Sequence, residues 1–377
     1  MRQFAETVLN GHPDKFCDLL ADAIIQETYN QDPNADAQIE VAMWRNCITL
    51  NGHITSTSEI ELNTADVISH VADACGFLSN HPLHPTKCTV ADNIERVDES
   101  PAKKNAPSND QSIIIGYAGY DCKTNYLRPE QFLSWFIREK LSKAIISGPL
   151  QGHGPDGKIL VSMREEPNGW FVDQILVSMQ QSDALSFQLF YAILRSVIQH
   201  AYHQARQMDA RWKSQQDDIT WLINPYGLWK SNDHEPDSGQ TGRKLVMDFY
   251  GPRIPLGGGA IYGKGWHHID RLASLAARAF AVEHVKRGAD EVHLQLCYAP
   301  GIQSPLQIEC IMNVKPCVEL NAFFQPKNMR ALLSSIDLNY SPYALGTFYN
   351  QELPFNQPGF LDAHRVSQPF QLKPINA

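Results

Sequence analysis

Strand-like and helix-like apolar patterns alternate along this 377-residue chain. Residues 112–118 form a short continuous apolar run, whereas the apolar residues of 14–28 recur at the spacing of one helix face. The helical spacing returns in 64–77 and 129–146. Sheets covered by helices accommodate both patterns, so the sequence predicts the α+β fold class.

The other predicted elements follow the same rules. Further strands are expected at 39–43, 47–50, 158–163, 170–179, 220–223, 245–250 and 291–298, and further helices at 183–204 and 270–287. Between them, 97–112 is polar and proline-rich, which is typical of a loop between domains. The chain therefore divides into three α+β segments: an N-terminal segment, 1–98, a central segment, 107–219, and a C-terminal segment with a tail, 220–377.

Composition excludes several classes of protein. Acidic residues outnumber basic ones by 41 to 32 and no basic stripe is visible, so no nucleic-acid partner is expected. No apolar run approaches the roughly 18 residues of a membrane-spanning helix. Residues 1–15 lack the apolar core of a signal peptide, and the 8 cysteines include no C-x-x-C pair. These features predict a cytoplasmic protein with reduced thiols and no membrane partner.

The first chemical motif is Gly11-His12-Pro13-Asp14-Lys15, at the start of the first predicted helix. Proline suits the first helical position. The N–H groups of a helix start favour anions, so His12 could donate to an anionic oxygen while Asp14 holds Mg²⁺. Taken alone, however, such a motif is more often an ordinary capped helix start.

The second motif runs from Asp237 to Lys244. Its glycines allow a tight turn, and Arg243 and Lys244 together suit phosphate oxygens. A glycine turn with solvated charges is an equal alternative.

The third motif, 255–265, is glycine-rich. Gly258 to Lys264 matches G-x-x-x-x-G-K, but Gly265 replaces the Ser or Thr of a P-loop. We therefore expect an anion-binding loop with a lysine rather than a P-loop. His267, His268 and Asp270 could ligate zinc, but neighbouring histidines on a helix diverge, which favours phosphate contact.

Weaker signals complete the set. Asp156 and Lys158 occupy a turn that enters a strand, Asp110 could be a metal ligand, a ribose ligand or a cap, and Trp229 could stack on a base or be buried. Several of these positive and acidic residues could together form a polyphosphate–Mg²⁺ site: His12, Asp14, Lys158, Asp237, Arg243, Lys244, Lys264, His268 and Asp270. The residues themselves predict an enzyme that uses a nucleoside triphosphate, without naming its reaction.

Four motifs in this order resemble the S-adenosylmethionine synthetase (methionine adenosyltransferase) family: GHPDKFCDLLADA, NDQSIIIGYA, PDSGQTGRKLVMDFYG and GGGAIYGKGWHHIDR. The resemblance implies three similar α+β domains around a pseudo-threefold axis. It also implies a homodimer or a dimer of dimers with active sites between subunits. The reaction would move the adenosyl group of ATP to the sulfur of methionine, and the released triphosphate would be cut to pyrophosphate and phosphate.

The resemblance also assigns residues. His12, Lys158, Arg243, Lys244, Lys264 and His268 match catalytic positions, and Asp14 and Asp270 match ligands of Mg²⁺. Glu40 matches the K⁺ ligand, so the resemblance implies Mg²⁺ and K⁺ as cofactors, although Tyr262 replaces a usual serine at the K⁺ site. Contacts to ATP are implied for His12, Asp110, Asp156, Lys158, Trp229, Asp237, Arg243, Lys244, Ala260 and Lys264. Contacts to the acceptor are implied for His53, Asp237 and His268.

Departures from the family pattern concentrate around the acceptor. His53 stands where a glutamate is usual, His268 where a second lysine is usual, Tyr262 where a serine is usual, and Ser112 where a glycine is usual. The gating loop, about 97–109, is also shorter and lacks its usual glutamine. Three hypotheses stay open: transfer to methionine, the same transfer to a related thioether, and a non-catalytic homologue that acts as a binding subunit.

Overall fold

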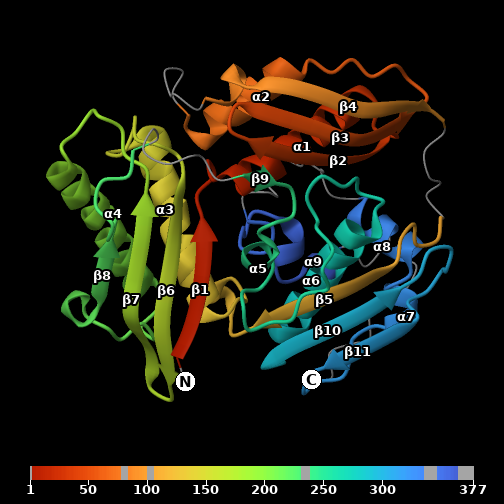
Figure 1. Ribbon diagram of the computed structural model, residues 1–377. Coiled ribbons are helices and arrows are strands. Elements are labelled where there is room, and N and C mark those ends of the chain that lie inside the picture. The colour runs from red at the N-terminus through yellow and green to blue at the C-terminus, as the bar shows by residue number, and fades with distance from the viewer. Residues whose placement is uncertain (1, 78–83, 100–105, 231–237, 335–345, 364–377) are drawn as a thin grey trace.

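The computed structural model describes residues 2–77, 84–99, 106–230, 238–334 and 346–363, which form three sheet-and-helix units (Figure 1). The first unit contains α1 (Pro13–Gln31), β2 (Asp36–Trp44), β3 (Cys47–Ser56), α2 (Thr64–Cys75) and β4 (Thr89–Asp98). The second contains α3 (Pro129–Ser147), β6 (Gly157–Glu166), β7 (Gly169–Met179), α4 (Phe187–Met208) and β8 (Thr220–Ile223). The third contains α6 (Ile269–Lys286), β10 (Glu291–Tyr298), β11 (Gln307–Ile311), α7 (Leu320–Phe323), α8 (Pro326–Leu333) and α9 (Phe360–Ala363).

Three further strands are exchanged in a cycle. β1 (Arg2–Val8) pairs with β6, β5 (Ser112–Gly119) pairs with β10, and β9 (Gly239–Gln240) pairs with β2, all antiparallel. Each is followed by a long helix and a hairpin, so one order of elements occurs three times. This repetition confirms the three similar α+β domains around a pseudo-threefold axis.

The exchange means that the sheets do not follow the predicted segments. Segment 1–98 gives β1 to the sheet of the second unit, 107–219 gives β5 to the third, and 220–377 gives β9 to the first. The division at 219/220 also separates β8 from its parallel neighbour β7, because Gln174 pairs in register with Thr220. The three segments thus interlock through their strands.

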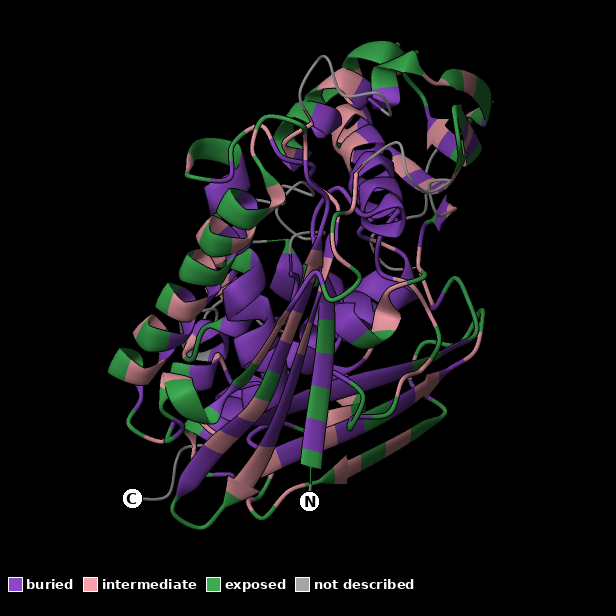
Figure 2. Ribbon diagram, turned by 60° about the vertical axis from the view of Figure 1, so that its left-hand side comes forward, coloured by how far each residue is buried: buried purple, intermediate pink, exposed green. Residues whose placement is uncertain are grey.

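Long helices at the centre of the molecule are almost wholly buried. α6 is buried from Ile269 to Val285, and α1 and α3 are buried over most of their first turns (Figure 2). By contrast, α4 buries only one stripe, which includes Phe190, Leu194 and Ile198, because it covers an outer face. None of the helices in the described ranges is long and apolar enough to cross a membrane.

Most predicted elements are confirmed, with one clear error. The predicted strand 245–250 is instead the short helix α5 (Leu245–Asp248) followed by a turn. Asp248, at the end of that helix, points inward and bonds to the buried ammonium of Lys15. An apolar run this short is compatible with either a strand or a helix. In this structure the segment is helical, and Asp248 forms a buried ion pair with Lys15.

Candidate active site

The first group of site residues lies at the start of α1. His12 caps the helix, and its Nδ1 accepts the backbone N–H of Asp14 at 3.2 Å. Asp14 is 1% exposed, bonds to the ammonium of Lys244, and lies 3.5 Å from Nε of Arg243. The two sequence motifs, separated by more than 220 residues, therefore meet at one helix terminus.

Burial and positive charge keep the His12 ring neutral. The pKa of His12 is lowered from 6.5 to about 3, mainly by burial and next by the ammonium charge of Lys244. The charge of Lys158 acts in the same direction. Since Nδ1 accepts a hydrogen bond, the proton of the neutral ring is on Nε2, which can donate to an oxygen of a ligand.

The pairing of β1 with β6 brings Lys158 and Asp156 close to the start of α1. Lys158 stands opposite Val8 in the β1–β6 register, and the N–H of Leu9 donates to the carbonyl of Gly157 at 2.9 Å. The segment before His12 thus runs beside the Asp156–Lys158 turn. Both side chains are partly buried.

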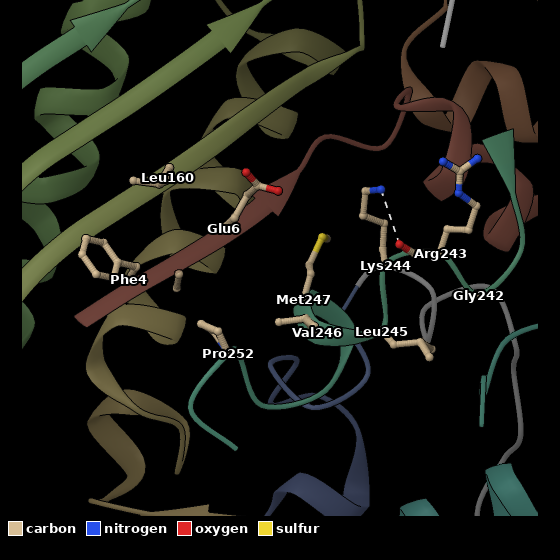
Figure 3. Close-up of a pocket in the computed structure, with 11 residues that line it drawn as sticks. Phe4, Glu6, Leu160, Gly242, Arg243, Lys244, Leu245, Val246, Met247 and Pro252 are labelled. Carbon is tan, nitrogen blue, oxygen red and sulfur yellow. Dashed lines mark hydrogen bonds between the residues drawn. The ribbon is translucent and has the colours of Figure 1, made fainter. Parts of the chain in front are cut away.

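A pocket of about 420 Å³ opens beside Arg243 and Lys244 (Figure 3). Strand β1 contributes Phe4 and Glu6, and the segment from Gly242 to Met247 forms the opposite wall. The Arg243 side chain is 49% exposed, so its guanidinium is accessible to a ligand.

Three carboxylates on α1 hold the two glycine-rich segments. Asp14 accepts the N–H of Gln240 at 3.0 Å, Asp18 that of Gly242 at 2.9 Å, and Asp22 that of Gly263 at 2.8 Å. Asp18 and Asp22 are fully buried. Because residues four apart lie on one helix face, this row fixes both segments on the same side of α1.

The edge of β2 holds the same two segments from the other side. The N–H of Thr241 donates to Val41 at 3.0 Å, and the N–H of Gly265 donates to Ala37 at 2.8 Å. The segments also touch each other, since a Cβ added at Gly242 would lie 2.9 Å from the Cβ of Ala260. Ala260 therefore lies where the Lys264 segment meets the Lys244 segment, and its contact with ATP stays a prediction.

The second group lies at the start of α6 and repeats the first. His268 caps the helix, its Nδ1 accepts the N–H of Asp270 at 3.2 Å, and Asp270 bonds to the ammonium of Lys264. His268 Nε2 lies 3.6 Å from the carboxylate of Asp110. Burial, followed by the charge of Lys264, lowers the His268 pKa to about 4. A histidine cap, an acid and a lysine thus occur at both helix starts.

The remaining predicted residues lie on β2, on β3 and after β8. Glu40 is half-buried on β2, where burial raises its pKa and the charge of Lys264 opposes that rise. His53 is exposed on β3, opposite Gln38 and Glu95 in register. Trp229 is partly buried, and its carbonyl accepts the N–H of Gln181 at 2.8 Å. Asp237 lies outside the described residues.

Sequence reasoning missed Asp18, Asp22 and the buried Lys15. Lys15 is fully buried between Asp18, 3.1 Å away, and Asp248, with its ammonium 4.4 Å from the ring centroid of Tyr262. The spacing of aspartates at 14, 18 and 22 is the signal that points to one helix face. Acids at this spacing on a helix with apolar neighbours predict buried acceptors rather than a solvated face.

The donor set suits a polyphosphate and a hard cation. Lys158, Arg243, Lys244 and Lys264 supply positive charge, and two neutral histidines supply N–H donors. Asp14 and Asp270 supply the carboxylate oxygens that Mg²⁺ prefers. The arrangement can therefore bind and stabilise charge on a triphosphate.

Comparison with known proteins agrees with this chemistry. Residues 2–99 match the S-adenosylmethionine synthetase N-terminal domain, and residues 232–341 match the C-terminal domain. The S-adenosylmethionine synthase of Borrelia garinii subsp. bavariensis is 30% identical over 369 residues, which cover 95% of this chain and 89% of that protein. The S-adenosylmethionine synthase of Synechococcus sp. is 32% identical over 327 residues, 81% of this chain and 79% of that protein. This chain therefore belongs to the S-adenosylmethionine synthetase family.

Proposed function

We propose that this chain transfers the adenosyl group of ATP to the sulfur of methionine, giving S-adenosylmethionine, and cleaves the triphosphate to pyrophosphate and phosphate. The observation that carries the proposal is the pair of helix starts, each with a histidine cap, a buried acid and a lysine. Family membership supports methionine over a different thioether or a purely binding role.

The geometry matches what this reaction needs. A thioether sulfur is already a nucleophile, so no general base has to remove a proton. Catalysis then depends on aligning the sulfur with C5′ and on stabilising the charge of the leaving triphosphate. We assign the Nε2–H of His12 to donate to the leaving oxygen, and Arg243, Lys244 and Lys158 to neutralise phosphate charge.

Cations complete the site. Mg²⁺ would be held by Asp14 and Asp270 and would neutralise phosphate oxygens when bound. Family members generally use Mg²⁺ and K⁺, and Glu40 is the residue proposed for K⁺. The phenol ring of Tyr262, buried beside Lys15, stands where the family usually has a serine, so the surroundings of the K⁺ site differ from the family pattern.

We also propose that a second copy of the chain completes each site. Family membership is what supports this arrangement. Sedimentation should then give at least twice the 42.4 kDa of one chain. A homogeneous monomer that is fully active would refute this arrangement.

One assay tests the function. Purified protein is mixed with ATP, Mg²⁺, K⁺ and either methionine or a panel of other thioethers. Mass spectrometry then detects the adenosyl sulfonium product, and a phosphate assay follows triphosphate cleavage. Product with methionine is expected. Product only with another thioether would reassign the acceptor, and ATP binding without any sulfonium would favour a non-catalytic subunit.

A further inference from the structure

The segment 106–110, which leads into β5, has no regular secondary structure but is bonded to other parts of the chain. Ser108 forms two backbone hydrogen bonds with the turn at 301–302, of 3.1 and 2.9 Å. The side chain of Asn109 accepts the N–H of Ile269, in the first turn of α6, at 2.9 Å. The segment is therefore held at its centre by the third unit.

Arg330 on α8 holds the start of the same segment. Its Nη1 donates to the carbonyl of Ala106 at 2.6 Å, and its Nη2 donates to the carbonyl of Pro107 at 3.5 Å. Arg330 is only 7% exposed. Burial lowers the pKa of Arg330, and the charge of Asp36, at the start of β2, opposes that decrease. One buried guanidinium thus faces both the 106–110 segment and the sheet of the first unit.

The held segment carries Asp110 to the start of α6. Oγ of Ser108 donates to the carbonyl of Asp110 at 2.8 Å, and the carboxylate of Asp110 lies 3.6 Å from Nε2 of His268. The Asp110 side chain is 52% exposed, so close packing does not fix it. Its place therefore depends on the backbone to which it is attached.

We propose that Arg330 is a positioning residue that sets the place of Asp110 for nucleotide binding at the start of α6. This inference rests on the proposed function, for which the family resemblance implies a contact between Asp110 and ATP. Arg330 acts through the backbone, because it bonds to carbonyls three and four residues before Asp110. A guanidinium presents its N–H donors in a fixed fork and can hold two neighbouring carbonyls, whereas an ammonium is a flexible point charge.

Two measurements on the full chain test this role without turnover. Hydrogen–deuterium exchange of the Ser108 N–H, which is bonded to the 301–302 turn, should be faster in Arg330→Met than in the unmodified protein. Titration with a non-hydrolysable ATP analogue and Mg²⁺ should give a Kd about tenfold higher in Arg330→Met. Unchanged exchange or an unchanged Kd would overturn the inference.

A double-mutant cycle separates positioning from a general loss of stability. Asp110→Asn removes the carboxylate, so adding Arg330→Met to it should raise the Kd much less than Arg330→Met does alone. If the two effects simply multiply, Arg330 does not act through Asp110. The cycle is repeated with Arg330→Lys, which keeps the buried charge facing Asp36 and should give a smaller increase in Kd with the same dependence on Asp110.

Arg287→Met is the matched control. The Arg287 side chain is 9% exposed and its Nε bonds to Glu283 at 2.9 Å, near the end of α6 rather than its start. This variant should lose stability in urea denaturation but keep the Ser108 exchange rate and the Kd, and an equal rise of the Kd in both arginine variants would overturn the inference. Binding of the analogue that Arg330→Met leaves unaltered refutes this inference alone, whereas no binding by the unmodified protein refutes the proposed function with it.

Discussion

Asp22 accepts the backbone N–H of Gly263 at 2.8 Å and receives Nη2 of Arg271 at 2.6 and 2.8 Å. One carboxylate of α1 thus holds the Lys264 segment and the first turn of α6 together. Gly263 immediately precedes Lys264 in the sequence. This contact therefore also fixes the backbone position from which the Lys264 side chain extends.

Removing that carboxylate should destabilise the fold strongly. Arg271 is 2% exposed, so Asp22→Ala leaves a buried guanidinium without its acid and should lower the free energy of unfolding by about 3–5 kcal/mol. Glu166→Ala removes the exposed ion pair with Arg164, 2.6 Å long, and should cost less than about 1 kcal/mol. Urea denaturation measures both, and equal losses would contradict the role given to Asp22.

Two glycines with positive φ separate backbone strain from steric overlap. Gly258 has φ 98° and nothing within 4 Å of an added Cβ, whereas at Gly263, φ 72°, a Cβ would overlap the carbonyl of Ile39. Gly258→Ala should therefore cost about 1 kcal/mol. Gly263→Ala should cost clearly more and reduce ATP turnover, because Lys264 shifts. Similar unfolding energies and similar turnover for the two variants would refute this difference.

Arg243→Ala tests the leaving-group assignment. Its half-exposed side chain contributes little to stability, so the variant should fold normally. Loss of charge stabilisation should reduce kcat about 10²–10³-fold, measured as triphosphate release. Lys158→Ala should behave similarly, and Arg164→Ala, which changes an exposed arginine on the same strand as Lys158, is the matched control. Turnover near that of the unmodified protein in either site variant would exclude the assigned role.

The acceptor pocket is tested by restoring the usual acid. His53→Glu should lower the KM for methionine, because a carboxylate can pair with the ammonium group of the substrate. Asn51→Glu adds the same charge two residues away on the same face of β3 and serves as the control. An unchanged KM in His53→Glu, or an equal decrease in both variants, would show that position 53 does not recognise that group.

Stability should fall in mild acid because of His284. This fully buried ring faces the carbonyl of Phe280 at 2.7 Å and accepts the N–H of Cys317 at 2.9 Å, and burial lowers its pKa to about 4. Below the unfolded pKa of about 6.5, only the unfolded chain gains the proton. Stability is therefore complete above pH 6.5 and decreases as pH falls towards 4, by up to about 3 kcal/mol. His284→Gln should flatten this part of the pH profile, and an unchanged slope would argue against His284.

Apolar periodicity in the sequence located the helices and strands whose buried side chains are apolar. It did not locate the strands whose inward-facing residues are polar or whose buried residues are few. The helices that begin at Pro13, Pro129 and Ile269 were predicted to within a few residues, since their apolar side chains recur at helical spacing. Strand β1 was missed because its inward residues include Gln3 and Thr7, while Phe4 is 49% exposed. In β4 only Ile94 is buried, so no alternation is visible.

The sequence predicted the charged residues that would contact a ligand. It did not predict the residues that hold the backbone of the site in place. The motifs named His12, Asp14, Arg243 and Lys244, and the structure brings these together. They did not name Asp18 or Asp22, whose role is to accept N–H groups from glycines far away in sequence. Such partners depend on the tertiary fold, and local spacing shows only the acids themselves.

The cyclic exchange of strands has a consequence during synthesis. When β1 leaves the ribosome, its partner β6, which begins at Gly157, has not yet been made. Likewise β2 is made before its partner β9, which begins at Gly239. At about 5–20 residues per second, β1 stays unpaired, and the edge of β2 that faces away from β3 stays open, for about ten seconds or more. Final assembly of all three sheets is therefore delayed until most of the polypeptide has emerged, and a transcript truncated within the third repeat would release a product with unpaired strand edges, which is prone to aggregate.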